Sequence, residues 1–168
     1  GYVCTVGLPA NTVVKGDNTA TVICTLKITV ANAQLAAVTI SGSTANNPPS
    51  LSTASAVFDA NFGDNVTLSA TKTGYVCTAV PSTIAPVKAA VSAKVTCVPN
   101  NHTVTVTNSQ LAAVKIVGST GTNASTTSSA ASVVFNVKYD NKITLTATKT
   151  GYVCTVGLPA NTVVKGDN

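Results

Sequence analysis

The sequence predicts an all-β fold made of tandem repeats of about 75 residues each, and three observations lead to that prediction. Residues 1–18 recur letter for letter as residues 151–168. Inside that interval, residues 26–44 match residues 102–120 at an offset of 76. Apolar residues in the repeated stretches alternate with Thr and Ser, the period of a half-buried strand. The chain is therefore expected to be a repetitive, polymer-forming protein, either as a window of a long tandem array or as a subunit with overlapping ends.

The strands follow from the alternation and the composition. Val and Thr are abundant, and their branched Cβ atoms suit a pleated strand. No segment carries a sustained apolar stripe at helical spacing. Turn-rich stretches at 61–65, 99–101 and 138–141 separate the strands and indicate a β-sandwich rather than a βαβ fold. The inward-facing residues are expected in three strands, in chain order: Val66, Leu68 and Ala70, then Val104 and Val106, then Ile143, Leu145 and Ala147.

The second internal match sets the expected domains. Residues 65–78 match residues 141–155, so the repeat is expected to restart at Gly74 and again at Gly151. A repeat of this size has a thin core and usually needs a covalent staple. The expected domains are 1–73, 74–150 and 151–168, the last being the start of a further repeat, with about 26–101 as the alternative phase of the folded unit.

Cysteine spacing predicts the staple. Cys4 and Cys24 lie 20 residues apart, and so do Cys77 and Cys97. Two disulfides are therefore expected, Cys4–Cys24 and Cys77–Cys97, with Cys154 bonded to a cysteine of the next unit. A loop of this length would contribute roughly 3 kcal/mol in the chain-entropy model. Persistent disulfides indicate an extracellular or cell-surface location.

Composition excludes several functions. The charge of +5 comes from ten scattered Lys against five Asp, without Arg or interleaved aromatic residues, so nucleic acid is not an expected partner. No run approaches the roughly 18 apolar residues of a membrane span. Close Cys/His spacings are absent, and His102 is expected at the surface, so neither a metal nor another cofactor is expected. With no Glu and no repeated Ser/His/Asp set, the protein is not expected to be an enzyme.

Surface modification and repeat junctions are the remaining candidates. Three sequons lie at apparent turns or loops, and two Ser/Thr-rich loops fall at equivalent places in the two halves. The N-glycosylation candidates are Asn65, Asn101 and Asn123. The O-glycosylation candidates are Ser43, Thr44, Ser50, Ser52, Thr53, Thr120, Thr122, Thr126, Thr127 and Ser128. The residues expected at the junctions between repeats are Lys72, Thr73, Gly74, Tyr75, Lys149, Thr150, Gly151 and Tyr152.

The stretches HTVTVTNSQLAAVKIVGST and VVFNVKYDNKITLTATKTGY resemble the PEGA-type and related immunoglobulin-like repeats of prokaryotic surface proteins. The matching positions are Val104, Val106, Val114, Ile116, Gly118, Ile143, Leu145, Gly151 and Tyr152. The resemblance covers about two-thirds of each half-repeat, and the cysteine pair departs from it. It implies a sandwich-type spacer or stalk module without catalysis, phased from about 26 to 101.

These observations favour a structural repeat unit of an extracellular filament or cell-surface stalk, which assembles with itself through the repeat junctions and carries covalent glycans. Successive repeats would be joined either within one covalent array or by residues 151–168 completing the sheet of the next subunit. The alternative is an adhesin or carbohydrate-binding module. Such modules usually offer aromatic platforms, and Tyr139 is the one candidate for an exposed ring.

Overall fold

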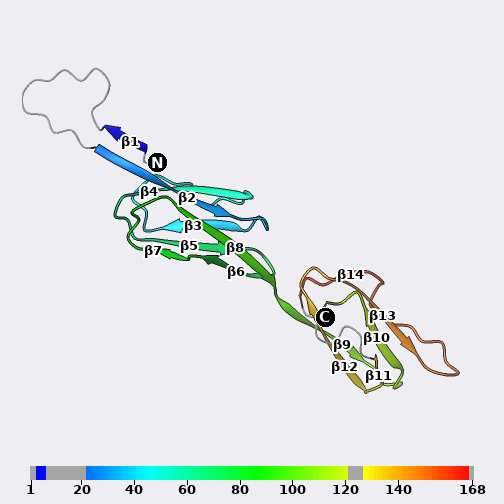
Figure 1. The fold of residues 1–168 in the computed structure, drawn as a ribbon. Helices are drawn as coiled ribbons and strands as arrows, with labels where there is room; N and C mark the ends of the chain where they lie inside the picture. The colour runs from blue at the N-terminus through cyan, green and yellow to red at the C-terminus, as the bar shows by residue number, and fades with distance from the viewer. Residues whose placement is uncertain (1–2, 7–21, 121–126, 167–168) are drawn as a thin grey trace, which may run out of the picture. The chain divides into compact units, whose positions relative to one another are not determined.

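The computed structural model describes residues 3–6, 22–120 and 127–166, and all regular structure in these residues is β-strand (Figure 1). The chain forms two compact units. Unit 1 consists of Gly1–Lys72 and Cys77–Cys97, and unit 2 of Thr73–Val76 and Val98–Asn168. The main boundary between them lies between Cys97 and Val98.

Unit 1 contains a mixed sheet and a smaller antiparallel sheet. In the mixed sheet, β2 pairs with β4 in antiparallel orientation, so that Ile28 faces Phe58, and with β8 in parallel orientation, so that Val30 faces Ala93. The mixed sheet consists of β1 (Val3–Val6), β2 (Val22–Ala31), β4 (Ser55–Asn61), β6 (Tyr75–Val80) and β8 (Val91–Pro99). The smaller sheet consists of β3 (Ala37–Ser41), β5 (Val66–Thr71) and β7 (Thr83–Ile84).

Unit 2 repeats this plan with fewer strands. The antiparallel pair β9 and β12 places Val104 opposite Phe135. That sheet consists of β9 (Asn101–Thr107) and β12 (Ser132–Lys138). The other sheet is β10 (Ala113–Val117), β11 (Thr127–Ser128), β13 (Lys142–Thr148) and β14 (Thr162–Val163).

The core of unit 2 lies between its two sheets. Alternate residues of β12 are buried, in agreement with the period of two. They pack in one cluster with alternate residues of β10 and β13, which belong to the other sheet. Two sheets facing each other across a common apolar layer are consistent with a β-sandwich. The cluster consists of Val104, Val114, Ile116, Val133, Phe135, Val137, Ile143, Leu145 and Val164.

The two units correspond in their turns as well as in their strands. Asn32 and Asn108 are buried just after β2 and β9, and each bonds to the backbone of the residue four positions later. Gly42 and Gly118 both have positive φ, and a Cβ on either would lie about 2 Å from a backbone carbonyl oxygen. The sequence match between the halves therefore extends to matching backbone geometry.

Candidate functional site

The most informative site is the groove beside the first strand of each unit, because the two units differ there. In unit 1, β8 fills this groove. Its inward side chains Ala93, Val95 and Cys97 are 6%, 4% and 4% exposed. β8 lies parallel to β2 and joins β6 to the sheet that β2 and β4 begin. We call β8 the closing strand of unit 1.

A side-chain clamp holds the end of this closing strand. Gln34 donates from Nε2 to the carbonyl oxygen of Cys97 at 2.9 Å, and the backbone nitrogen of Cys97 donates to Gln34 Oε1 at 2.5 Å. Lys72 Nζ in turn donates to the carbonyl oxygen of Gln34 at 2.7 Å. An amide side chain used in this way replaces a missing strand neighbour for one residue of the ladder. Sequence reasoning missed Gln34, although its stretch recurs in both halves.

Both expected disulfides are present. Cys77 of β6 is bonded to Cys97 of β8, and Cys4 is bonded to Cys24, which it faces directly in the β1–β2 pairing. Each bond therefore links two neighbouring strands of the mixed sheet. Cys154 carries a free, half-buried thiol.

Unit 2 has the same groove without a closing strand in the described part of the chain. β9 pairs with β12 there, and residues 152–156 form no strand, whereas the corresponding β6 pairs with β8. An open groove of about 360 Å³ lies between β9 and this segment. Val106 is only partly buried, while the corresponding Val30, which pairs with Ala93 of β8 in the same sheet, is fully buried. The groove is lined by residues that include Val106, Asn108, Gln110, Ala147, Cys154 and Val156.

The groove of unit 2 nevertheless keeps the framework that holds a closing strand in unit 1. Lys149 Nζ donates to the carbonyl oxygen of Gln110 at 2.6 Å, as Lys72 does to Gln34. Asn108 Nδ2 donates to the carbonyl oxygens of Ala112 and Ala130, at 2.8 and 2.9 Å. The side chain of Gln110 is exposed, in the position that Gln34 uses to clamp Cys97.

The other end of the described chain carries the complementary feature. β2 is one strand with two roles: Val22–Thr25 pair with β1, and Thr25–Ala31 pair with β4. By sequence the first part corresponds to the end of β8 and the second to β9, which follows β8 after the single residue Asn100. Val22 is 61% exposed, whereas the corresponding Val95 is 4% exposed. Val22 thus occupies a sequence position that is buried in β8, but its own side chain is exposed.

The expected junction residues fall in two groups. Lys72 belongs to unit 1, while Thr73, Gly74 and Tyr75 cluster with unit 2, where the Gly74 carbonyl oxygen accepts from the backbone nitrogen of Asn100 at 2.8 Å. Lys149, Thr150, Gly151 and Tyr152 form the turn after β13, with the Lys149 ammonium 4.8 Å from the Tyr152 ring centroid.

Tyr139 is not the exposed ring that the adhesin alternative requires. Its ring makes a T-shaped contact with Tyr75, with centroids 5.7 Å apart, and lies 6.0 Å from the ring of His102. Lys165 Nζ lies 4.8 Å from its centroid. The residue is half-buried, because these neighbours cover the ring.

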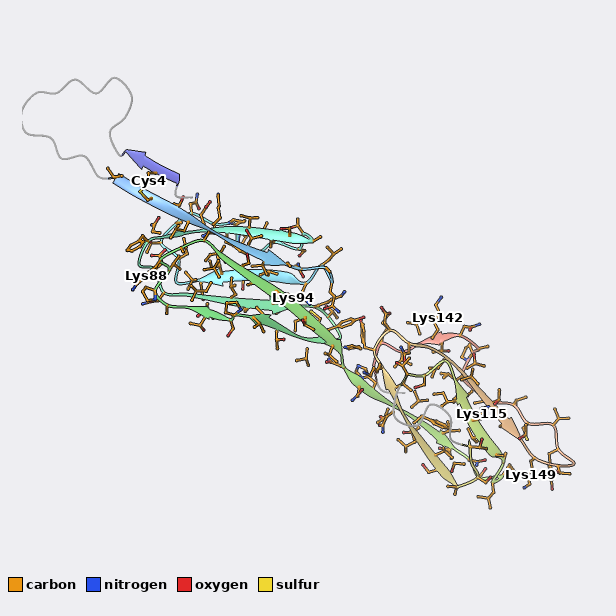
Figure 2. All side chains as sticks on the ribbon, in the orientation of Figure 1. Cys4, Lys88, Lys94, Lys115, Lys142 and Lys149 are labelled. Carbon is orange, nitrogen blue, oxygen red and sulfur yellow. A yellow bond between two sulfur atoms is a disulfide. The ribbon has the colours of Figure 1, made fainter. Side chains whose placement is uncertain are left out.

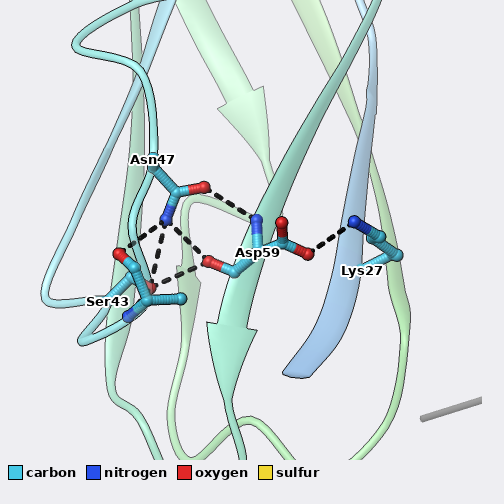
Figure 3. Close-up of polar contacts among 5 residues, drawn as sticks. Lys27, Ser43, Asn47 and Asp59 are labelled. Carbon is cyan, nitrogen blue, oxygen red and sulfur yellow. Dashed lines mark hydrogen bonds and ion pairs between the residues drawn. The ribbon is translucent and has the colours of Figure 1, made fainter. Parts of the chain in front are cut away.

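The first Ser/Thr-rich loop is tied to the sheet by polar contacts. Asn47 accepts from the backbone nitrogen of Asp59 at 2.7 Å and donates to its carbonyl oxygen at 2.7 Å (Figure 3). Ser43 Oγ donates to the same carbonyl oxygen, and the Asp59 carboxylate pairs with Lys27 at 2.7 Å. Thr44 donates from both its backbone nitrogen and its hydroxyl to Asp64. The loop is therefore an ordered surface segment.

Burial raises the pKa of Asp64, but the hydrogen bonds from Thr44, Asn61 and Ser43 outweigh it and hold the pKa below its ordinary value of 3.8. In unit 2 the corresponding residue is Asn141, whose Oδ1 accepts from the Thr120 backbone nitrogen and hydroxyl. A carboxylate is thus unnecessary for this contact.

The candidate glycosylation residues differ in their accessibility. Asn65 is exposed in the turn between β4 and β5, and Asn101 is exposed as the first residue of β9 rather than in a turn. The hydroxyls of Ser43, Thr44 and Thr120 are engaged in the loop contacts described above. Ser50, Ser52, Thr53 and Thr127 are exposed and Ser128 is half-buried, while Thr122, Asn123 and Thr126 lie outside the described residues.

Charge is spread over both units, and the described residues do not form a metal centre. Lys88 and Lys94 in unit 1, and Lys115, Lys142 and Lys149 in unit 2, lie on separate elements (Figure 2). The described residues contain no group of three or more His, Cys or Asp side chains that could hold a metal ion. They also contain no helix of the length and apolar character needed to cross a membrane.

Comparison with known proteins gives no match: neither a protein-family model nor a curated protein sequence matches this chain.

Proposed function

We propose that this chain is a structural repeat unit of an extracellular filament or cell-surface stalk, built from immunoglobulin-like β-sandwich units that follow one another as a rod. The observation that carries the proposal is the direct succession of β8 and β9. The closing strand of unit 1 is followed after one residue by the first strand of unit 2, and β2 combines the same two roles in a single strand. Repeats connected in this way are suited to a mechanical element because so little linker separates them.

The disulfides and the exposed hydroxyls support an extracellular setting. Two disulfides staple strands of a protein whose units are small, which is typical of secreted domains. Asn65, Asn101 and the exposed Ser and Thr residues of the first loop would be accessible to glycosylation. Glycans at these positions would protect a fibre from proteases.

The experiment is electron microscopy of the native material, followed by the mass of its polypeptide after reduction, denaturation and deglycosylation. We expect filaments. A polypeptide near 16.7 kDa would mean that separate subunits polymerise, and a much larger one would mean a covalent array. Short soluble monomers with intact disulfides would refute the structural function.

A further inference from the structure

We propose that the open groove of unit 2 binds residues 18–24 of a second copy of this chain as a parallel strand on β9, and that Cys154 then bonds to Cys24 of that copy. This inference rests on the proposed function, because it names the segment through which the repeats join. The occupant is assigned by analogy with unit 1, where β8 lies beside β2 at the corresponding position.

Residues 18–24 have the inward side chains of the closing strand. In unit 1 these are Ala93, Val95 and Cys97, all buried in β8. The segment Asn18–Cys24 reads NTATVIC, and β8 reads VSAKVTC over residues 91–97. Three of the four inward positions are therefore identical, Ala, Val and Cys in both, while Asn18 stands where β8 has Val91 and the outward positions differ. Identity confined to the inward face is what a shared groove requires.

The register on β9 follows from the pairing of β2 with β8. Val30 faces Ala93 in that parallel pair, so Val106 would face Ala20 of the second copy. Gln110 would then clamp the backbone of Cys24, as Gln34 clamps that of Cys97. Adding a strand to an open sheet edge satisfies backbone groups and buries Val106 at the same time.

The covalent step is a thiol–disulfide exchange that needs no oxidant. The Cys154 thiolate attacks Sγ of Cys24 in the Cys4–Cys24 disulfide of the second copy. The Cys154–Cys24 bond forms, the Cys4–Cys24 bond breaks, and Cys4 leaves as a thiolate that takes up the proton lost by Cys154. Cys4 is exposed in the structure, so its disulfide can be reached.

The exchange changes the free energy of the strand around Cys24 little, because the pairing segment that leaves and the one that arrives have the same sequence. β1, which pairs with Val22–Thr25, reads VCTV, and residues 153–156 also read VCTV. The second copy thus exchanges its own segment for an identical one, which is a low-cost route to association. The free energy gained on association then comes from filling the groove. Because the donor segment belongs to unit 1 and the groove to unit 2, each copy can bind a further copy, and association is head to tail and open-ended.

The test uses the full 168-residue chain in two variants mixed together. Val22→Asp places a charge on the donor strand at a position that is 61% exposed in the unassociated chain. Val106→Asp places a charge in the groove. Val117→Asp, on an outward position of β10 that is 50% exposed, is the matched control. Each chain is incubated at mildly alkaline pH without reductant, and its size is measured by light scattering after size exclusion.

We expect the natural chain and Val117→Asp to form a ladder of oligomers, and each groove or donor variant alone to remain monomeric. A mixture of Val22→Asp and Val106→Asp should stop at one-to-one dimers, because one functional groove meets one functional donor. Oligomers of Val22→Asp alone, or no dimer in the mixture, would overturn the inference.

If Val106→Asp loses the circular dichroism signal of unit 2, Gln110→Ala is used in its place. The Gln110 side chain is exposed, and the hydrogen bond from Lys149 to the Gln110 carbonyl oxygen does not depend on that side chain. Gln110→Ala should weaken association roughly 30-fold, the equivalent of the two hydrogen bonds of the clamp. Filaments that form equally with Val22→Asp would contradict this inference while leaving the filament function in place. Native material that is monomeric by microscopy would contradict the function itself.

Discussion

Gln34→Ala and Gln110→Ala form a matched pair that tests whether the glutamine acts only on a closing strand. In unit 1, the Gln34 side chain forms two hydrogen bonds with the backbone of Cys97, a residue that is 4% exposed. Each bond contributes on the order of 1 kcal/mol net, so their loss should lower the free energy of opening of β8 by about 2 kcal/mol. That difference corresponds to a roughly 30-fold larger open population.

The assay is native-state hydrogen exchange of the β8 backbone amides, which reports local opening directly. We expect exchange of these amides to accelerate roughly 30-fold in Gln34→Ala, as derived from the two lost hydrogen bonds. In the unassociated chain, Gln110→Ala should leave exchange in unit 2 unchanged, because no described strand lies over its exposed side chain. Equal effects of the two substitutions, or no effect of Gln34→Ala, would refute this explanation of the groove.

Three further predictions concern stability. Replacing Cys77 and Cys97 together by Ser should reduce the free energy of urea unfolding of unit 1 by about 3 kcal/mol, and a loss below about 1 kcal/mol would contradict the staple. Asn32→Ala and Asn108→Ala should each cost about 3 kcal/mol in thermal unfolding, because each leaves buried backbone groups without partners; unequal costs would contradict the correspondence of the units. Since the folded-state pKa of Asp64 is lowered, its stabilisation is present above its ordinary value of 3.8 and is lost as pH falls through the lower folded value; Asp64→Asn should remove this acid dependence of unit 1 unfolding, and an unchanged pH profile would exclude the role.

Local patterns of the sequence predicted the strands and the staples well. Alternation over 66–71 and 142–148 corresponds to β5 and β13, and the repeated spacing of 20 residues corresponds to both disulfides. These features depend on neighbouring residues or on repetition, which a sequence displays directly.

Long-range pairing was not predictable in the same way. Nothing in the alternation of 91–99 shows that β8 lies parallel to β2, because the partner is distant in the chain. The role of Gln34 depends on that pairing and was missed with it. Asn47 likewise looked like an ordinary loop residue, yet it pairs with the Asp59 backbone as a strand neighbour would. A side chain that substitutes for backbone leaves no periodic trace.

Closure of each unit by a strand of the next repeat is tested most directly by mapping the disulfides of the native material without reduction. We expect Cys154 to be recovered bonded to the peptide that contains Val22, Ile23 and Cys24, whether that peptide comes from a second copy or from a continuing array. Recovery of Cys154 as a free thiol, or bonded to another Cys154, would contradict the proposed junction.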